Sequence, residues 1–507
     1  MTDSLTETPE RSTEAETVEV DVAILGAGFS GLGMAIDLLR RGREDFIVLE
    51  RGADVGGTWE FNTYPGCACD VPSALYSFSF APNPDWTRTY SRQPEIRDYL
   101  HRLADRFGVR EKVRLRTEVL SAEWSPDEQR WAIETTTGSL NARVLIAGAG
   151  PLAEPKLPDV PGIEDFEGHS FHSARWDHSY DLTGKRVAAI GTGASAIQFV
   201  PEIQPQVEQL YVMQRTAPWI APHTARPVSR LERTLYRRIP ALQRLQRGFV
   251  YTAREALLGP GFFKQPKLLG VIQKLAERHM DQQVSDPELR RKVQPNYTIG
   301  CKRLLPSNKW YPALAEDNVE LLTGGVKEFK ANSIVTGEGI EVEVDAVVYG
   351  TGFQVAEMPI GEFVRGRDGS TLAEHWDGSP RAHLGMTING FPNLFLLLGP
   401  NTGLGHSSMV YMIESQVARV TAALDAIDEN AAETIEVTAE AQREFSESVD
   451  ERMQATVWNT GCSSWYIDRT GRNSILWPDF TFLFRNRSKR LEPGDFEFAG
   501  AREEVAA

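Results

Sequence analysis

The sequence predicts an α/β protein that contains two parallel-sheet units and a helical insertion. Two glycine-rich turns, each between an apolar strand and a helix, lead to this class; they lie at residues 26–31 and 191–196. A basic, Leu-rich segment at about 224–298 has helical spacing and little strand signal. The chain has 507 residues, too many for one hydrophobic core. We therefore expect two Rossmann-like dinucleotide-binding domains with a helical insertion.

Composition narrows the class of partners. The net charge of −16 argues against binding to nucleic acid or to an anionic membrane. No apolar run approaches the ~18 residues that a membrane span needs, and the acidic N-terminal stretch does not resemble a signal peptide. We expect a cytoplasmic protein in which all four cysteines are free thiols and no metal is bound. These cysteines are Cys67, Cys69, Cys301 and Cys462.

The first glycine-rich turn has the full dinucleotide-binding pattern. It follows the strand expected at Val18–Leu25 and opens a helix, and the next strand, Phe46–Leu49, ends in an acid. In this pattern the first glycine makes a tight turn, the second lets the backbone approach a pyrophosphate, and the third lets helix and strand pack closely. The acid accepts the adenosine ribose hydroxyls. The residues assigned to these tasks are Gly26, Gly28, Gly31 and Glu50.

The second turn follows a strand at Lys185–Ile190, and its residues assigned to the dinucleotide are Gly191, Gly193, Ser195 and Ala196. The next strand ends not in an acid but in Gln214-Arg215-Thr216. A cation and a hydroxyl at this place suit the 2′-phosphate of NADPH, which a carboxylate would repel. One site that ends in Glu and one that ends in Arg therefore indicate FAD in the first domain and NADPH in the second.

The order of these elements gives a domain layout in which the chain leaves the first domain, builds the second and returns. The apolar run at 394–398 is expected to be a buried strand of the first domain, and the following turn at 399–406 could present Asn401 and backbone amides to a flavin. The expected parts are a disordered tail (1–17), an FAD-binding domain (18–160 and 385–490), an NADPH-binding domain (161–384) capped by its insertion (224–298), and a C-terminal tail (491–507).

Between the two turns lies a segment whose residues Phe166, Gly168, His172, Trp176 and Asp177 match the pattern FxGxxxHxxxW(P/D). On this segment the chain resembles the type I Baeyer–Villiger monooxygenases, a group of class B flavoprotein monooxygenases. The resemblance covers roughly residues 20 to 485. Its further matches are Gly57-Thr58-Trp59, Asp70, Cys301-Lys302-Arg303 and Ser464-Trp465.

The resemblance implies a role for each matched segment. Thr58, Trp59 and Asp70 would lie beside FAD, while Lys302 and Trp465 would contact NADPH together with Arg215 and Thr216. Asp70 would hold Arg303 in place. The reaction gives an independent reason for Arg303. NADPH reduces the flavin, oxygen adds at flavin C4a, and the resulting peroxide must attack a carbonyl as an anion, which a fixed guanidinium would stabilise. His172 is interpreted as an orienting residue of the linker.

The expected function is therefore NADPH- and O2-dependent insertion of oxygen beside a ketone carbonyl, giving an ester or lactone. An N- or S-oxygenating flavin monooxygenase is the main alternative, and the Trp176-Asp177 ending with Lys302-Arg303 favours the first. A disulfide reductase would need a CxxC or CxxxxC pair, which Cys67 and Cys69 do not form. A non-catalytic flavin sensor is a further alternative. The expected partners are a small ketone and O2, in a monomer or a homodimer.

Overall fold

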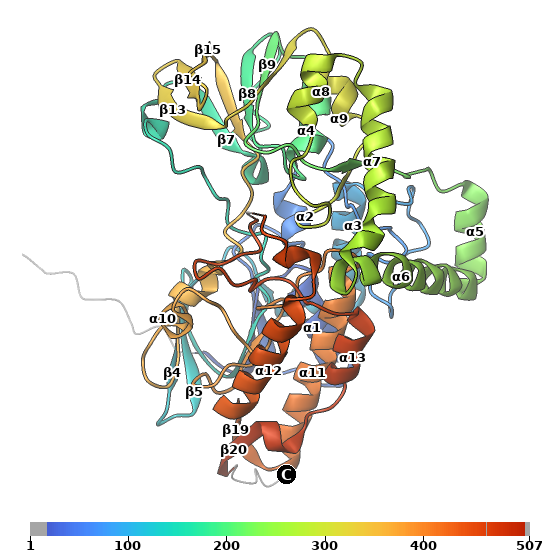
Figure 1. The fold of residues 1–507 in the computed structure, drawn as a ribbon. Coiled ribbons are helices and arrows are strands. Elements are labelled where there is room, and N and C mark those ends of the chain that lie inside the picture. The colour runs from blue at the N-terminus through green and yellow to red at the C-terminus, as the bar shows by residue number, and fades with distance from the viewer. Residues whose placement is uncertain (1–17, 463, 502–507) are drawn as a thin grey trace, which may run out of the picture.

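The computed structural model of the protein describes residues 18–462 and 464–501, which form two sheet-based units joined by crossing segments (Figure 1). The expected disordered tail at 1–17 and the last residues of the expected C-terminal tail lie outside the described residues. None of the helices in the described part of the chain combines the length and the apolar character needed to cross a bilayer. The cytoplasmic location stays a prediction.

The first unit is built on an eight-stranded sheet in the order β17-β4-β5-β6-β1-β2-β3, with β18 also paired to β6. Strands β2, β1, β6 and β18 are parallel, and most of their apolar residues are buried on both faces. The strands are β1 (Val18–Leu25), β2 (Phe46–Leu49), β3 (Val113–Arg114), β4 (Val119–Ser125), β5 (Arg130–Thr135), β6 (Gly138–Ala147), β17 (Val364–Arg365) and β18 (Leu394–Leu396).

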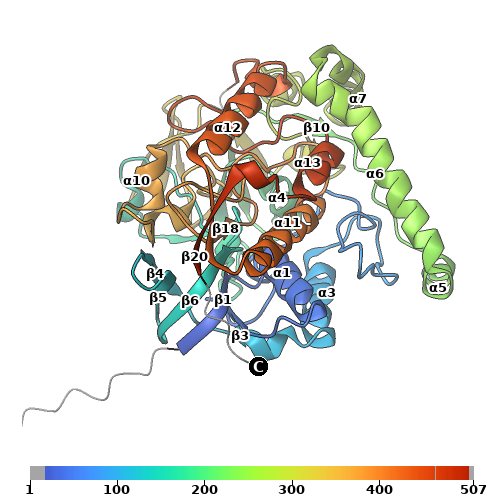
Figure 2. The ribbon, with the colours of Figure 1, turned by 90° about the horizontal axis from the view of Figure 1, so that it is seen from below.

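Helices from distant parts of the chain cover this sheet. Helix α1 (Phe29–Arg40) packs against α11 (Met409–Glu429), which in turn contacts α13 (Thr481–Ser488), and Figure 2 shows these helices side by side. The other helices of this unit are α2 (Thr58–Phe61), α3 (Gln93–Arg106), α10 (Leu372–Trp376) and α12 (Ala439–Met453). The N-terminal and C-terminal parts of the chain therefore share one hydrophobic core.

The second unit has a five-stranded parallel sheet in the order β12-β9-β8-β16-β7. Helices α4 (Ala196–Ile203) and α9 (Trp310–Leu314) pack beside it, and a small antiparallel sheet and a short parallel pair flank it. The strands are β7 (His169–His172), β8 (Arg186–Ile190), β9 (Gln209–Met213), β12 (Val319–Leu322) and β16 (Ala346–Tyr349), with β13 (Val326–Lys330), β14 (Ser333–Thr336), β15 (Glu341–Glu343), β10 (Ile220–Ala221) and β11 (Leu305–Pro306).

The helical insertion begins close to its expected place and consists of α5 (Arg230–Arg238), α6 (Pro240–Phe263), α7 (Gly270–Gln283) and α8 (Pro287–Val293). Figure 1 shows α5 and the first turns of α6 projecting beyond the two units. The C-terminal end of α6 is anchored instead, because Phe262 and Phe263 are buried in a cluster with Trp458 and Tyr466. The insertion therefore reaches the C-terminal part of the first unit as well as capping the second.

Two expected boundaries are wrong. The chain re-enters the first sheet at β17, where Val364 pairs with Ala122, about twenty residues before the expected boundary at 385. The segment Phe496–Ala501 of the expected C-terminal tail is strand β20, antiparallel to β19 (Ala432–Val437). Phe496 is buried in the core of the first unit, and this apolar contact explains why the segment is ordered.

Candidate active site

The first glycine-rich turn can hold a pyrophosphate only with glycine at its key positions. Gly26 has a φ of +90°, and a Cβ on Gly31 would lie 1.8 Å from the Gly26 carbonyl oxygen. Helix α1 begins after Gly28, which carries no side chain that could cap the first amides. These N–H groups and the positive end of the helix dipole suit a doubly charged phosphate bridge.

Glu50, at the end of β2, is buried and organises the same turn. Its carboxylate oxygens accept hydrogen bonds from the backbone N–H groups of Ala27 and Gly52, each at 2.7 Å. A carboxylate offers about four lone-pair sites, so Glu50 keeps capacity for the hydroxyls of a ribose. This is the position that the sequence predicts for it.

The second glycine-rich turn has the same requirements. Gly191 has a φ of +107°, and a Cβ there would lie 2.4 Å from the carbonyl oxygen of Gly350. The space around Gly193 is open, and Ser195 stands at the N-cap of α4. The hydroxyl of Thr192 donates to the carbonyl of Thr216 at 3.1 Å, which fixes the turn to the end of β9. The turn can therefore receive a second dinucleotide.

Two cations from different segments influence each other's charge, and one of them follows β9, the strand after the second turn. Arg215 is exposed after β9, and Lys302 comes from the segment that follows the insertion. The pKa of Lys302 is lowered by burial and by the charge of Arg215, so the two side chains are close enough to repel each other. Lys302 Nζ also lies 4.9 Å from the ring centre of Tyr297. A phosphate bound between the two cations would relieve their repulsion.

Asp70 and Arg303 form an ion pair between the two units. Arg303 Nε and Nη2 both contact Oδ2 of Asp70, at 2.7 and 2.6 Å, and Nη1 donates to the carbonyl of Leu404 at 3.1 Å. The charge of Asp70 raises the pKa of Arg303 despite burial. Burial alone would raise the pKa of Asp70, but the charge and hydrogen bonds of Arg303 outweigh it and hold this pKa below its usual value. Both groups are therefore charged.

The segment before Asp70 brings the two glycine-rich turns toward each other. Tyr64 donates its hydroxyl hydrogen to Oε1 of Gln198 on α4 at 2.9 Å, and Gln198 also bonds the backbone of Ala68 in both directions. Gly66 has a φ of +82°, and a Cβ there would lie 2.7 Å from the Gln198 carbonyl oxygen. The first unit therefore touches the helix that begins at the second turn.

Arg254, on α6 of the insertion, is a charged neighbour of this pair that sequence reasoning missed. Its Nε donates to the carbonyl of His406 at 2.7 Å. Burial lowers the pKa of Arg254, Tyr90 and Asp70 act in the opposite direction, and the charge of Arg303 adds to the lowering. The sequence did not indicate that Arg254 lies near Asp70 and Arg303, because a helical pattern does not show where the helix packs.

The segment 166–177 contains β7, the edge strand of the second sheet. A Cβ on Gly168 would lie 2.4 Å from the ring of Phe166, so the glycine allows this ring to fold back. His172 ends β7, accepts from the Ala174 N–H at 3.0 Å, and has its pKa lowered to about 4 by burial. Trp176 packs on Phe199 of α4, and Asp177 bonds His169 and Ser179. The orienting role of His172 stays a prediction.

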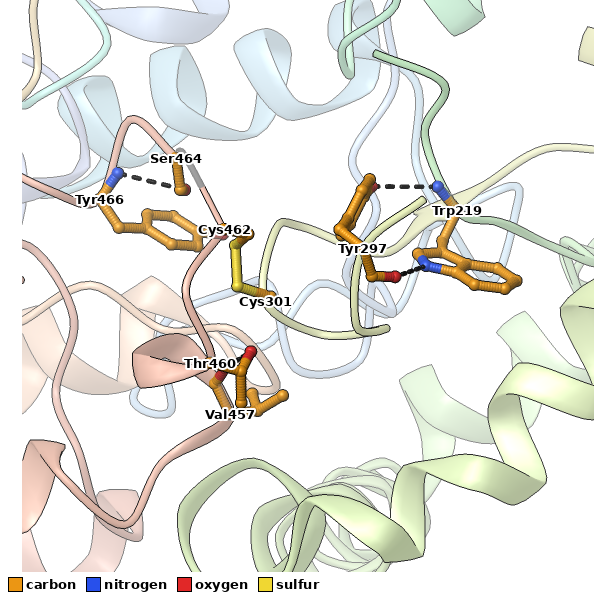
Figure 3. The surroundings of a disulfide bond; sticks show 8 residues. All are labelled: Trp219, Tyr297, Cys301, Val457, Thr460, Cys462, Ser464 and Tyr466. Atoms are coloured by element: carbon orange, nitrogen blue, oxygen red, sulfur yellow. Dashed lines mark hydrogen bonds between the residues drawn. A yellow bond between two sulfur atoms is a disulfide. The ribbon is translucent and has the colours of Figure 1, made fainter. Parts of the chain in front are cut away.

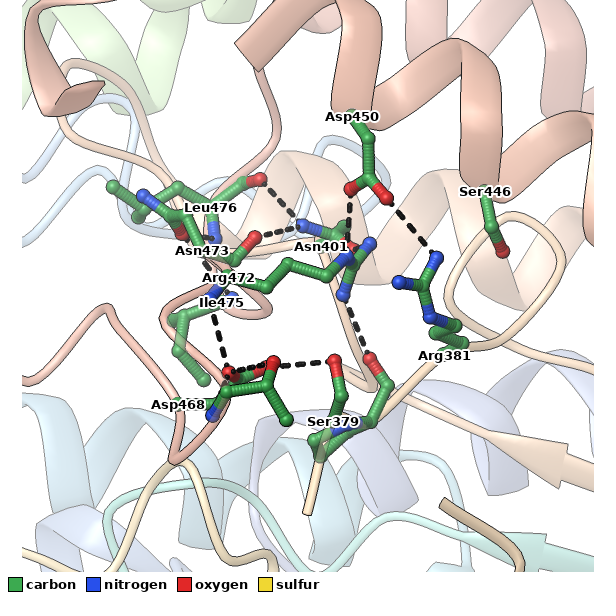
Figure 4. Close-up of polar contacts among 12 residues, drawn as sticks. Ser379, Arg381, Asn401, Ser446, Asp450, Asp468, Arg472, Asn473, Ile475 and Leu476 are labelled. Carbon is green, nitrogen blue, oxygen red and sulfur yellow. Dashed lines mark hydrogen bonds and ion pairs between the residues drawn. The ribbon is translucent and has the colours of Figure 1, made fainter. Parts of the chain in front are cut away.

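Asn401 does not lie free for a flavin. Its side chain donates to the carbonyls of Asn473 and Leu476 and accepts from Arg472 Nη2 at 2.6 Å. Arg472 also contacts Asp450 of α12 at 2.6 Å (Figure 4). The side chain of Asn401 thus joins the turn at 399–406 to the segment 468–476. Its interpretation as a flavin contact stays a prediction that the side-chain geometry does not support.

The expectation of four free thiols is wrong for two of them. Cys301 and Cys462 form a disulfide, with their Cα atoms 6.3 Å apart, whereas Cys67 and Cys69 are buried free thiols (Figure 3). The pairing was hidden because the partners are 161 residues apart in the chain.

Trp465, three residues after Cys462, is 48% exposed, and Tyr466 beside it is buried. On the flavin side, Thr58 begins α2 and Trp59 donates its indole N–H to the hydroxyl of Tyr76.

Comparisons with known proteins agree with this arrangement. The flavin-binding monooxygenase-like family model matches residues 19–245. A Baeyer–Villiger monooxygenase of Streptomyces coelicolor is 50% identical over 480 residues, which are 94% of this chain and 92% of that protein. A Baeyer–Villiger monooxygenase of Pseudomonas aeruginosa is 49% identical over 483 residues, 95% of this chain and 92% of that protein.

Solved structures give the same result at the level of the fold. The closed crystal structure of cyclohexanone monooxygenase has a TM-score of 0.86 and 28% identity, covering 96% of this chain and all of that one. Cyclohexanone monooxygenase from Rhodococcus sp. Phi1 bound to NADP+ has a TM-score of 0.84 and 29% identity, with 96% and 100% covered. Oxidized steroid monooxygenase bound to NADP has a TM-score of 0.83 and 32% identity, with 95% and 100% covered.

The predicted fold class and cofactors are thereby confirmed: the two units are the FAD and NADPH domains, and the two glycine-rich turns fit these dinucleotides. The chain belongs to the type I Baeyer–Villiger monooxygenases, and it is an NADPH-dependent flavin enzyme that inserts oxygen by the Baeyer–Villiger reaction.

Proposed function

We propose that the substrate is a small ketone, that O2 supplies the inserted atom, and that Arg303 is the catalytic cation, positioned by Asp70. The observation that carries this proposal is the way Arg303 is held. Three contacts fix its guanidinium, two to Asp70 and one to Leu404. A guanidinium has five N–H donors, so Nη1 and Nη2 each keep one for a bound oxygen. The fixed fork can therefore point toward negative charge without prior rearrangement.

Bound FAD supplies the hydride acceptor and the carrier of activated oxygen. The contribution of this chain is charge and position. Arg303 stabilises the negative oxygen that develops next to the carbonyl carbon, and Asp70 keeps the guanidinium from turning away. Arg254, the second cation beside Asp70, adds positive potential to the same place. This cluster favours attack by an oxygen anion over transfer to the lone pair of an amine or a sulfide.

The NADPH contacts belong to the same proposal. Arg215 and Lys302 bind the 2′-phosphate, because their charges act on each other and Arg215 follows the strand after the second turn. Thr216 holds the turn through its carbonyl group. Trp465 would approach the nicotinamide ribose from the loop that precedes Tyr466. Thr58 and Trp59 would line the flavin, since α2 lies next to the first turn through contacts of Gly57 with Gly28.

Product analysis tests the reaction class. The flavin-loaded enzyme is incubated with NADPH, 18O2 and a panel of linear, cyclic and aryl ketones that also contains a sulfide and a tertiary amine. We expect esters or lactones that carry one 18O atom, formed in a fixed ratio to NADPH oxidised. Oxidation of the sulfide or amine alone, with no ester, would contradict the proposal. Light scattering of the same sample decides between the monomer and the homodimer.

A further inference from the structure

The Cys301–Cys462 disulfide stands where two segments of the site meet. Cys301 directly precedes Lys302 and Arg303, and Cys462 lies three residues before Trp465. We propose that this pair is a reversible redox-modification site that fixes the segment 460–462 to the Lys302–Arg303 segment and thereby controls NADPH binding. The inference rests on the proposed roles of Lys302 and Arg303.

The disulfide is a covalent connection between two loops, and the hydrogen bonds next to it are local on each side. On one side, the Thr460 hydroxyl donates to the Val457 carbonyl at 2.7 Å, and the Tyr466 N–H donates to the Ser464 hydroxyl at 3.3 Å. On the other side, the Cys301 N–H donates to the carbonyl of Thr298 at 3.1 Å. Figure 3 shows the sulfur–sulfur bond between the two loops. Without it, the segment 464–467 would still be held by the packing of Tyr466 and by the bridge between Ile467 and Asn473.

This packing is close to the charged pair. Tyr466 is buried, and its pKa is raised to about 12 by burial against the opposing charge of Arg303. Release of the segment 460–462 would therefore loosen a wall of the Arg303 site and move Trp465 relative to Lys302. Since both segments are assigned to NADPH, the state of the disulfide and the binding of NADPH are coupled. Such coupling is reciprocal, and bound NADPH must shift the thiol–disulfide equilibrium by the same factor.

Cys462 is the more accessible of the two cysteines. Cys301 is 1% exposed, whereas Cys462 is half-buried and lines a cavity of about 470 Å³. The wall of this cavity consists of the loop 460–462, the segment 294–298 and residues of α7, together with Trp219. A small thiol or peroxide would therefore react first at Cys462, and Cys301 would act as its buried partner.

Reduction and re-formation of this disulfide both balance in atoms and electrons. In reduction, a dithiol thiolate attacks Sγ of Cys462, the disulfide breaks, and Cys301 leaves as a thiolate that takes a proton from water. The second thiol of the reagent then releases Cys462, so the protein pair gains two electrons and the dithiol becomes a disulfide.

In oxidation, the Cys462 thiolate attacks hydrogen peroxide and forms a sulfenic acid with loss of hydroxide. The Cys301 thiol then attacks the sulfur of this sulfenic acid, so that the disulfide forms and water leaves. The hydroxide released in the first step takes up a proton and also becomes water.

The other two cysteines are natural controls. Cys67 and Cys69 are both buried, and burial raises the pKa of Cys67 to about 12 and that of Cys69 well above its usual value. A buried thiol that stays protonated reacts slowly with peroxides and disulfides. A redox response of the enzyme therefore belongs to Cys301 and Cys462. Cys67→Ser is the matched control because it removes a sulfur atom without touching this pair.

The test compares the flavin-loaded enzyme after oxidation with hydrogen peroxide and after reduction with dithiothreitol, each followed by desalting. Thiol titration under denaturing conditions should count two thiols in the oxidised form and four in the reduced form, since the chain has four cysteines and one disulfide. We expect the reduced form to have a KM for NADPH on the order of fivefold higher, and re-oxidation to restore it. Saturating NADP+ should raise the concentration of dithiothreitol that is needed to reduce half of the disulfide.

Cys462→Ser and Cys301→Ser should behave like the reduced enzyme and lose the response, while Cys67→Ser keeps it. Four thiols after oxidation, or the same KM for NADPH in both forms, would overturn the inference. KM is read from the rate of flavin bleaching, which does not require a ketone. If the KM for NADPH responds to the redox state but no ester forms, the redox inference stands and the proposed function is rejected. If ester forms but the KM does not respond, the proposed function stands and the redox inference is rejected.

Discussion

Replacement of Arg303 separates the effect of its charge from the effect of its geometry. A unit charge about 4 Å from a developing oxyanion contributes about 4 kcal/mol at the effective dielectric constant of a partly exposed site, which corresponds to roughly a thousandfold in rate. Arg303 and Asp70 are 29% and 23% exposed, so this dielectric is appropriate. We therefore expect Arg303→Ala to form ester at about a hundredth to a thousandth of the wild-type rate.

Arg303→Lys keeps the charge but not the fork. A single ammonium cannot contact Asp70 and Leu404 and also point at the substrate as the guanidinium does. We expect this variant to lie between wild type and Arg303→Ala, with a loss of roughly tenfold to a hundredfold. Asp70→Asn should show a similar loss, because Arg303 keeps its charge and one weaker partner.

Stopped-flow measurement of flavin reduction by NADPH, oxygen consumption and ester yield separate the two halves of the reaction. Reduction should continue in Arg303→Ala, and the oxygen consumed should appear as hydrogen peroxide instead of ester. Arg278→Ala, which removes an exposed cation from α7, is the control and should keep its yield. A near-normal ester yield from Arg303→Ala would refute the assignment and require another cation.

Three further changes test the nucleotide sites and the fingerprint segment. Arg215→Ala should raise the KM for NADPH roughly tenfold to a hundredfold in steady-state kinetics and leave NADH use nearly unchanged; equal losses for both would assign Arg215 to the fold. Gly31→Ala would place a Cβ 1.8 Å from the Gly26 oxygen, so the purified variant should lack the yellow flavin absorbance, and a full spectrum would contradict this steric reasoning. The pKa of His172 is about 4 in the folded enzyme against 6.5 ordinarily, so the unfolded chain binds more protons between these values. The free energy of unfolding should therefore fall by up to about 3 kcal/mol as pH drops from 6.5 to 4, and His172→Gln should flatten this part of a urea-unfolding series.

The parts of the fold that local pattern determines could be predicted from the sequence. The strands Val18–Leu25 and Phe46–Leu49 lie where their apolar runs predict them, and the first glycine of each turn has a backbone angle that only glycine adopts easily. Strand β17 escaped prediction because its two residues are defined only by pairing with β4.

The candidate site was predictable to the extent that motifs mark it. The approach of Asp70 to Arg303, 233 residues apart, was expected from the family pattern and is present. Arg254 and the Cys301–Cys462 bond were not foreseen, since both depend on how the insertion and the C-terminal loop pack in space. For Asn401 the sequence predicted a contact with flavin, but its side-chain amide donates to the carbonyl of Asn473 in the same chain.

The strand order of the first sheet also sets how much of the chain must be synthesised before the FAD unit can fold. Strand β6 lies between β1 and β18, and α1 is covered by α11, so this sheet is complete only after residues 394–429 have left the ribosome. The second unit is contiguous except for its insertion and closes with β16, about fifty residues earlier. At roughly 5–20 residues per second, the NADPH unit has several seconds to form before the FAD unit can close. A nascent chain that stops before β18 would therefore leave one edge of β6 unpaired, and an unpaired edge strand invites pairing with other chains.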